Sequence, residues 1–101
     1  MFLHTTEGYH TVLALVKLAA EGDEGAEEQL FNRGTAGRDE LLKLAADRKS
    51  RKQHPTVAWL LLTLFPSPES EAAAKSMLDN ATEPDLQNAL AVAIAAGSRR
   101  A

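Results

Sequence analysis

The stretch HPTVAWLLLTLF, residues 54–65, is the most apolar part of this chain and decides its fold. Pro55 suits the first turn of a helix, where its missing N–H breaks no intrahelical hydrogen bond, and Pro66 ends that helix. The apolar run is too short to cross a hydrocarbon layer, which takes about 20 residues. Because apolar side chains lie all around this helix, neighbouring helices must cover it on every side. The sequence therefore predicts a buried helix in the middle of a domain.

Five further helices are predicted from apolar residues at helical spacing and from residues that cap or stop a helix. They are expected from Thr5 or Thr6 to Gly22, over 23–32 with Gly34 as a stop, over 37–51, from a Ser67 cap to Asn80, and from a Thr82 cap to Gly97. Thr82 and Asp85 have the spacing of an N-terminal capping box.

Length and composition limit the fold to one domain, residues 1–101, with frayed tails at 1–4 and 98–101. Hydrophobic residues make up 45% of the chain but aromatic residues only 5%, so Leu, Val and Ala must form the core, as in closely packed helices. We expect an all-α fold of about six antiparallel helices in three hairpins. The chain has no cysteine, which excludes disulfides and thiolate metal sites.

The opening stretch has a partial repeat 29 residues later, in EPDLQNALAVAI, residues 83–94. Pro55 corresponds to Pro84, and Leu61 corresponds to Leu90. The segment PSPESEAAAKSMLDNATEPDLQNALAVAI resembles a whole HEAT-like helical repeat. The resemblance covers residues 54–97 and is weak over the first half of the chain. It implies a short stacked α-solenoid that binds macromolecules, and it implies no reaction; an irregular helical bundle is the alternative fold.

No catalytic or metal-binding motif is present in the sequence. It has no glycine-rich phosphate loop, no H-E-x-x-H and no cysteine nucleophile. His4, Glu7 and His10 are spaced three apart, but two histidines six residues apart point about 120° away from each other on a helix and cannot share an ion. We therefore expect a protein that is not an enzyme and has no metal or cofactor.

Charge is segregated along the chain, although the net charge is only −3. The acidic segment predicts a surface for a basic protein partner, formed by Glu21, Asp23, Glu24, Glu27 and Glu28. The basic segment DRKSRKQH predicts an alternative, a nucleic-acid surface formed by Arg48, Lys49, Arg51, Lys52 and His54. In both cases the opposing interpretation is a solvated, charged face with no partner.

The last predicted helix carries a third candidate surface. Opposite its apolar stripe lie small, weakly polar residues, namely Gln87, Asn88, Ala91 and Ala95. Terminal helices of solenoids usually present a polar face to solvent. This face therefore predicts a helix-packing interface, with a second copy in a homodimer or with another protein.

Taken together, these features predict a non-enzymatic protein–protein interaction module or scaffold, in a specific version an inhibitor or immunity-type binder of a basic partner. The alternative function is a nucleic-acid-binding regulator that uses residues 48–54. The N-terminal sequence MFLHTTEGYH lacks the basic and apolar regions of a secretion signal, so we expect a cytoplasmic protein with no membrane partner.

Overall fold

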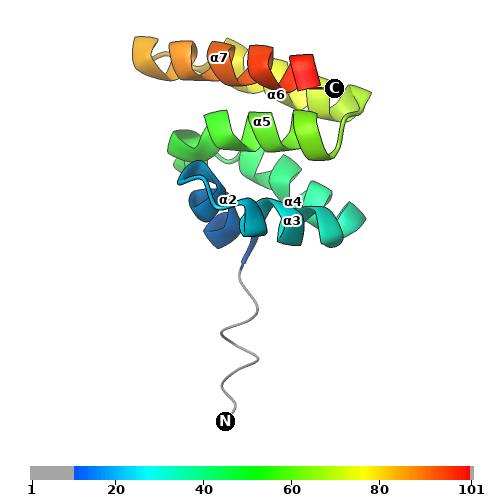
Figure 1. Cartoon of the computed structure of the whole chain (residues 1–101). Coiled ribbons are helices and arrows are strands. Elements are labelled where there is room, and N and C mark those ends of the chain that lie inside the picture. The colour runs from blue at the N-terminus through cyan, green and yellow to red at the C-terminus, as the bar shows by residue number, and fades with distance from the viewer. Residues whose placement is uncertain (1–10, 101) are drawn as a thin grey trace.

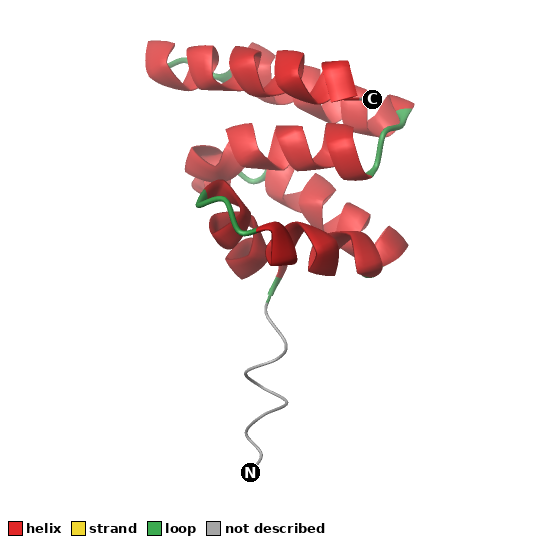
Figure 2. Ribbon diagram, in the orientation of Figure 1, coloured by secondary structure: helices red, strands yellow, loops and turns green. Residues whose placement is uncertain are grey.

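The computed structural model describes residues 11–100, which form α-helices, one 3₁₀ helix and no strand (Figures 1 and 2). The elements are α2 (Val12–Ala20), α3 (Glu24–Asn32), α4 (Gly34–Ala46), η1 (Arg48–Gln53), α5 (His54–Leu64), α6 (Pro68–Asn80) and α7 (Pro84–Arg100). The predicted all-α fold is confirmed. The expected tail at residues 1–4 and the expected helix start at Thr5 or Thr6 lie outside the described residues. In the described part, Thr11 caps α2.

Helix α5, formed by the opening stretch, lies at the centre of the molecule. It packs against α7, α6, α4, α2 and α3, and Figure 1 shows it between the α6–α7 pair and the helices of the first half. Six of its eleven residues are buried, including Val57, Leu60 and Leu61. The prediction that this helix is covered by neighbours is confirmed.

Each α-helix from α2 to α6 packs against the next α-helix along the chain. Alternate helices also pack against each other, α4 with α6 and, most extensively, α5 with α7. In Figure 1, α5 and α7 run in the same direction and α6 runs back between them along the chain. The resemblance to HEAT-like repeats stays a prediction.

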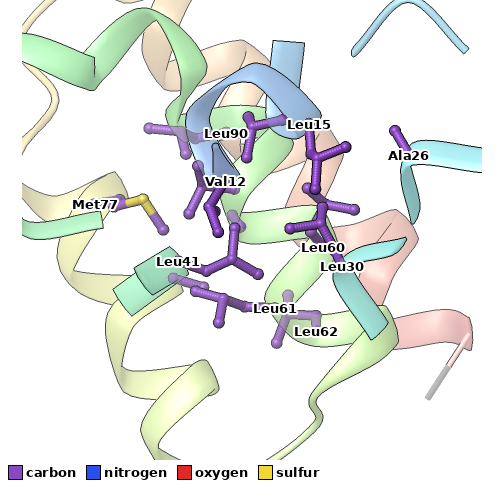
Figure 3. Close-up of a cluster of buried hydrophobic side chains, with 14 of the residues drawn as sticks. Val12, Leu15, Ala26, Leu30, Leu41, Leu60, Leu61, Leu62, Met77 and Leu90 are labelled. Carbon is purple, nitrogen blue, oxygen red and sulfur yellow. The ribbon is translucent and has the colours of Figure 1, made fainter. Parts of the chain in front are cut away.

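A single leucine-rich core joins the helices (Figure 3). Its fully buried leucines come from α2, α3, α4, α5 and α7: Leu15, Leu30, Leu41, Leu60, Leu61 and Leu90. Helix α6 adds Ala74 and Met77. Each buried leucine removes enough apolar area from water to stabilise the fold by about 1.5–3 kcal/mol. Leu61 and Leu90, which the 29-residue pattern makes equivalent, are both fully buried.

Glycine and serine act at helix ends as the sequence indicates. Gly22 follows α2 with a φ of 96°, and the N–H groups of Gly22 and Asp23 donate to Ala19 and Leu18 at 3.0 and 3.1 Å. This is the Schellman arrangement, which favours glycine because a Cβ atom is strained at positive φ. The Ser67 hydroxyl accepts a hydrogen bond from the Ser70 N–H and caps α6.

The predicted third helix is wrong at both ends. Helix α4 begins at Gly34, directly after α3, and ends at Ala46 instead of Arg51. Asp47 stops it: the carboxylate accepts hydrogen bonds from the Lys49 N–H (3.0 Å) and the Ser50 hydroxyl (3.2 Å). These bonds start the 3₁₀ helix η1. A side chain that bonds nearby backbone groups competes with helix continuation, as aspartate does here.

The predicted last helix also needs two corrections. Helix α7 begins at Pro84, and the Glu83 carbonyl accepts the first helical hydrogen bond from Gln87, so Glu83 occupies the N-cap position expected for Thr82. Gly97 does not stop the helix, which continues to Arg100 through the expected tail. Gly97 is instead buried against Leu62 of α5.

None of the helices in the described range 11–100 combines the length and the apolar character needed to span a membrane.

Candidate functional site

The acidic surface consists of Glu21, Asp23, Glu24, Glu27 and Glu28, and it follows the turn from α2 into α3. Asp23 is the N-cap of α3: its carboxylate accepts from the N–H groups of Gly25 (2.9 Å) and Ala26 (3.3 Å). Glu24 and Glu27 lie in the first turn, where the positive end of the helix dipole favours negative charge. The local helix start therefore concentrates these carboxylates at one corner of the molecule.

Within the described part of the chain, no cation forms an ion pair with these carboxylates. The ion pairs within residues 11–100 are Arg38–Asp39 (3.2 Å), Lys43–Glu40 (3.2 Å) and Arg51–Glu83 (3.6 Å), and none involves the acidic surface. Four of its five residues are exposed, and Glu27 is half-buried. The acidic surface thus presents net negative charge to whatever approaches it.

A pocket of about 380 Å³ adjoins the acidic surface. It is formed where α2, α3, α5 and α7 meet and is lined by Ala19, Ala20, Gly22, Glu27, Pro55, Thr56, Trp59 and Ala93. Among the described residues that line it, Glu27 is the one charged residue and Trp59 the one aromatic residue. Sequence reasoning did not identify Thr56, Trp59 or Ala93 as site residues. No local signal marks them, because residues from four separate helices form this pocket.

In the basic segment, residues 47–54, the fold buries His54 and leaves the other basic side chains exposed. Arg48, Lys49, Arg51 and Lys52 lie on η1 with exposed side chains. His54 does not join them, because it is only 7% exposed. His54 is therefore not part of the exposed basic surface, and the role of the other four residues in nucleic-acid binding stays a prediction.

His54 instead connects α5 to the end of α4. Its Nε2 atom lies 2.9 Å from the Leu44 carbonyl oxygen and 3.1 Å from that of Asp47. Since carbonyl oxygens only accept hydrogen bonds, Nε2 carries a proton and donates to both. These carbonyl oxygens also accept from the backbone N–H groups of Asp47 and Ser50, respectively. The imidazole is therefore a second donor to each of them, and it ties α5 to the end of α4.

Glu83, just before α7, and Asp85, in its first turn, lie beside the basic segment. Two pockets, of about 490 and 460 Å³, border η1, and both contain Arg51 and Glu83. Asp85 lines the first of them as well. The Arg51–Glu83 pair and the nearby Asp85 reduce the positive field that a phosphate backbone would require.

The predicted packing surface on α7 is exposed in all four of its residues, Gln87, Asn88, Ala91 and Ala95. Gln87 has a local role, since its Nε2 donates to the Ala81 carbonyl oxygen at 2.7 Å. Val92, which the prediction did not include, is 69% exposed on the same helix.

No group of three or more histidine or acidic side chains within the described residues is arranged to hold a metal ion. His4, Glu7 and His10 lie outside the described range.

Comparison with models of protein families, with curated proteins and with solved structures finds no match to this chain. Its function must therefore be inferred from the surfaces of the molecule itself.

Proposed function

We propose that this protein is a non-enzymatic, cytoplasmic binding module that docks a basic protein through its acidic surface. The observation that carries the proposal is the set of five carboxylates around the α2–α3 turn, none of which pairs with a cation in residues 11–100. A narrower form of the proposal is an inhibitor or immunity-type protein that covers a basic functional surface of its partner.

Electrostatic attraction would act in two stages. Exposed carboxylates steer a basic partner during diffusional encounter, and this raises the association rate by about 10- to 1000-fold. The stacked helices then offer a preformed surface, so little conformational entropy is lost on docking. The resemblance to HEAT-like repeats likewise implies a stacked helical protein that binds macromolecules.

The alternative is nucleic-acid binding through Arg48, Lys49, Arg51 and Lys52. All four are exposed, which favours this function, but the Arg51–Glu83 ion pair at 3.6 Å and the neighbouring Asp85 weigh against it. No aromatic residue lies in η1 to stack on bases. One experiment separates the two functions.

That experiment is an affinity capture from nuclease-treated and untreated extract of the native cells. It compares the wild type with an acid-neutralised variant (E24Q, E27Q, E28Q), a base-neutralised variant (R48A, K49A, R51A, K52A) and a control (E69Q, E71Q, D79N). The control is matched because Glu69 and Glu71 occupy the first turn of α6 as Glu24 and Glu27 occupy that of α3.

We expect a basic protein that is retained after nuclease treatment, is lost with the acid-neutralised variant and is retained by the control. The partner must then be purified and shown to bind directly. Retention of nucleic acid alone, abolished by the base-neutralised variant, would overturn the proposal in favour of the alternative.

A further inference from the structure

We propose that the pocket between α2, α3, α5 and α7 receives one arginine side chain of the basic partner, with Glu27 pairing to the guanidinium and Trp59 packing against it. This inference rests on the proposed function and adds which chemical group of the partner is recognised, and where. We call this cavity the Glu27 pocket.

Glu27 differs from the other residues of the acidic surface in its environment. It is half-buried, whereas Glu21, Asp23, Glu24 and Glu28 are exposed. Its carboxylate has no hydrogen bond or ion pair with any described residue, and no other charged group among residues 11–100 lines the pocket. A partly desolvated carboxylate loses hydration without compensation, and a cation that enters the pocket restores that interaction.

The remaining lining suits the rest of an arginine side chain. Ala19, Ala20 and Ala93 are small and apolar, and a basic side chain packs its aliphatic stem on such surfaces while its charged head pairs elsewhere. Trp59 offers the aromatic ring that attracts cations most strongly. The pocket is an open depression of about 380 Å³, which is large enough for one long side chain.

Arginine fits this lining better than lysine does. The planar guanidinium can stack on an aromatic ring and pair with a carboxylate at the same time, and it is less strongly hydrated than an ammonium group. The other carboxylates of the acidic surface lie around the same α2–α3 turn as the lining residues Gly22 and Glu27, and they favour a partner segment with further positive charge. The Glu27 pocket would thus provide specificity within a surface that otherwise acts by long-range attraction.

Occupation of the pocket can be followed by tryptophan fluorescence, because Trp59 is the only tryptophan of the chain. The probes are ten-residue peptides that alternate glycine with arginine, with lysine, or with the neutral arginine analogue citrulline. Calorimetry measures binding anywhere on the protein, and Trp59 emission measures occupation of the pocket. The full-length variants are Glu27→Gln, Glu28→Gln as the matched control on the same helix, and Ala20→Leu.

Ala20→Leu tests the cavity without any change of charge. Ala20 is exposed and lines the pocket, so a leucine there partly fills the cavity without crowding the core. Circular dichroism checks that each variant keeps its helices.

In titrations with the arginine peptide, we expect Trp59 emission to shift, and the peptide concentration at half of that shift should match the Kd from calorimetry. The citrulline peptide should change neither signal. Glu27→Gln should raise the Kd about tenfold or more, and Ala20→Leu should also raise it, whereas Glu28→Gln should change it less than about threefold. The lysine peptide should bind more weakly than the arginine peptide.

Two results would count against the inference in distinguishable ways. If the arginine peptide binds through Glu24 and Glu28 but neither shifts Trp59 emission nor responds to Glu27→Gln, the pocket is not used and the proposed function stands. If no basic peptide binds and the acid-neutralised variant captures the same partner as the wild type, both the inference and the proposed function are overturned.

Discussion

A Cβ atom placed on Gly97 of α7 would lie 2.9 Å from the Cβ atom of Leu62 on α5. The two helices therefore meet at a point where only a glycine leaves room for the Leu62 side chain. Gly97 is buried and helical, so it serves close packing of α7 on the central helix and does not end the helix.

Replacing Gly97 by alanine should destabilise the protein by about 1–3 kcal/mol, because an added methyl group overpacks the contact with the base of the Leu62 side chain. The higher helix propensity of alanine, worth about 1 kcal/mol, offsets only part of this cost. Chemical denaturation measures the change. Ser98→Ala, an exposed change in the same turn, should alter stability by less than about 0.5 kcal/mol. Equal stability of Gly97→Ala and wild type would show that α7 moves away at no cost.

His54→Ala should lower the free energy of unfolding by about 1–3 kcal/mol, because the carbonyl groups of Leu44 and Asp47 lose the Nε2 donor. Lys52→Ala, an exposed change two residues earlier, should have little effect. Urea denaturation of the two variants makes the comparison. An unchanged stability for His54→Ala would mean that water replaces the imidazole as donor.

Ser70 is fully buried, and its hydroxyl donates to the Phe65 carbonyl oxygen at 2.6 Å. Ser70→Ala removes this bond at the α5–α6 turn and should cost about 1–3 kcal/mol. Ser76→Ala, on an exposed part of the same helix, is the control and should cost less than about 0.5 kcal/mol. Thermal unfolding followed by circular dichroism can rank the three proteins; a lower melting temperature for Ser76→Ala than for Ser70→Ala would contradict the prediction.

The association rate with the basic partner should fall roughly tenfold or more between about 0.1 M and 1 M salt, because the Debye length shortens from about 10 Å to about 3 Å. Stopped-flow kinetics with the purified partner measures this dependence. The acid-neutralised variant should show a much weaker salt dependence than the wild type. A rate that is insensitive to salt in the wild type would exclude electrostatic steering by the acidic surface.

Much of the fold could be predicted because its signals are local. Gly22 and Gly34 lie just past α2 and α3, where both have positive φ, and Ser67 caps α6 through its own hydroxyl. The all-round apolar character of residues 54–65 correctly placed α5 in the centre, since burial on every side is a property of that stretch alone. A predicted helix end was wrong where a side chain bonds to nearby groups and thereby stops the helix, as the Asp47 carboxylate does at the end of α4.

Local sequence patterns were enough to predict the order of the helices, the central place of α5 and the accumulation of acidic residues at the α2–α3 turn. The burial of His54, the pairing of Arg51 with Glu83, and the shared pocket of Glu27 and Trp59 follow from tertiary packing. The physical reason is separation along the chain. Helical periodicity and capping act over a few residues, whereas Glu27 and Trp59 are brought together by the packing of several helices around one core.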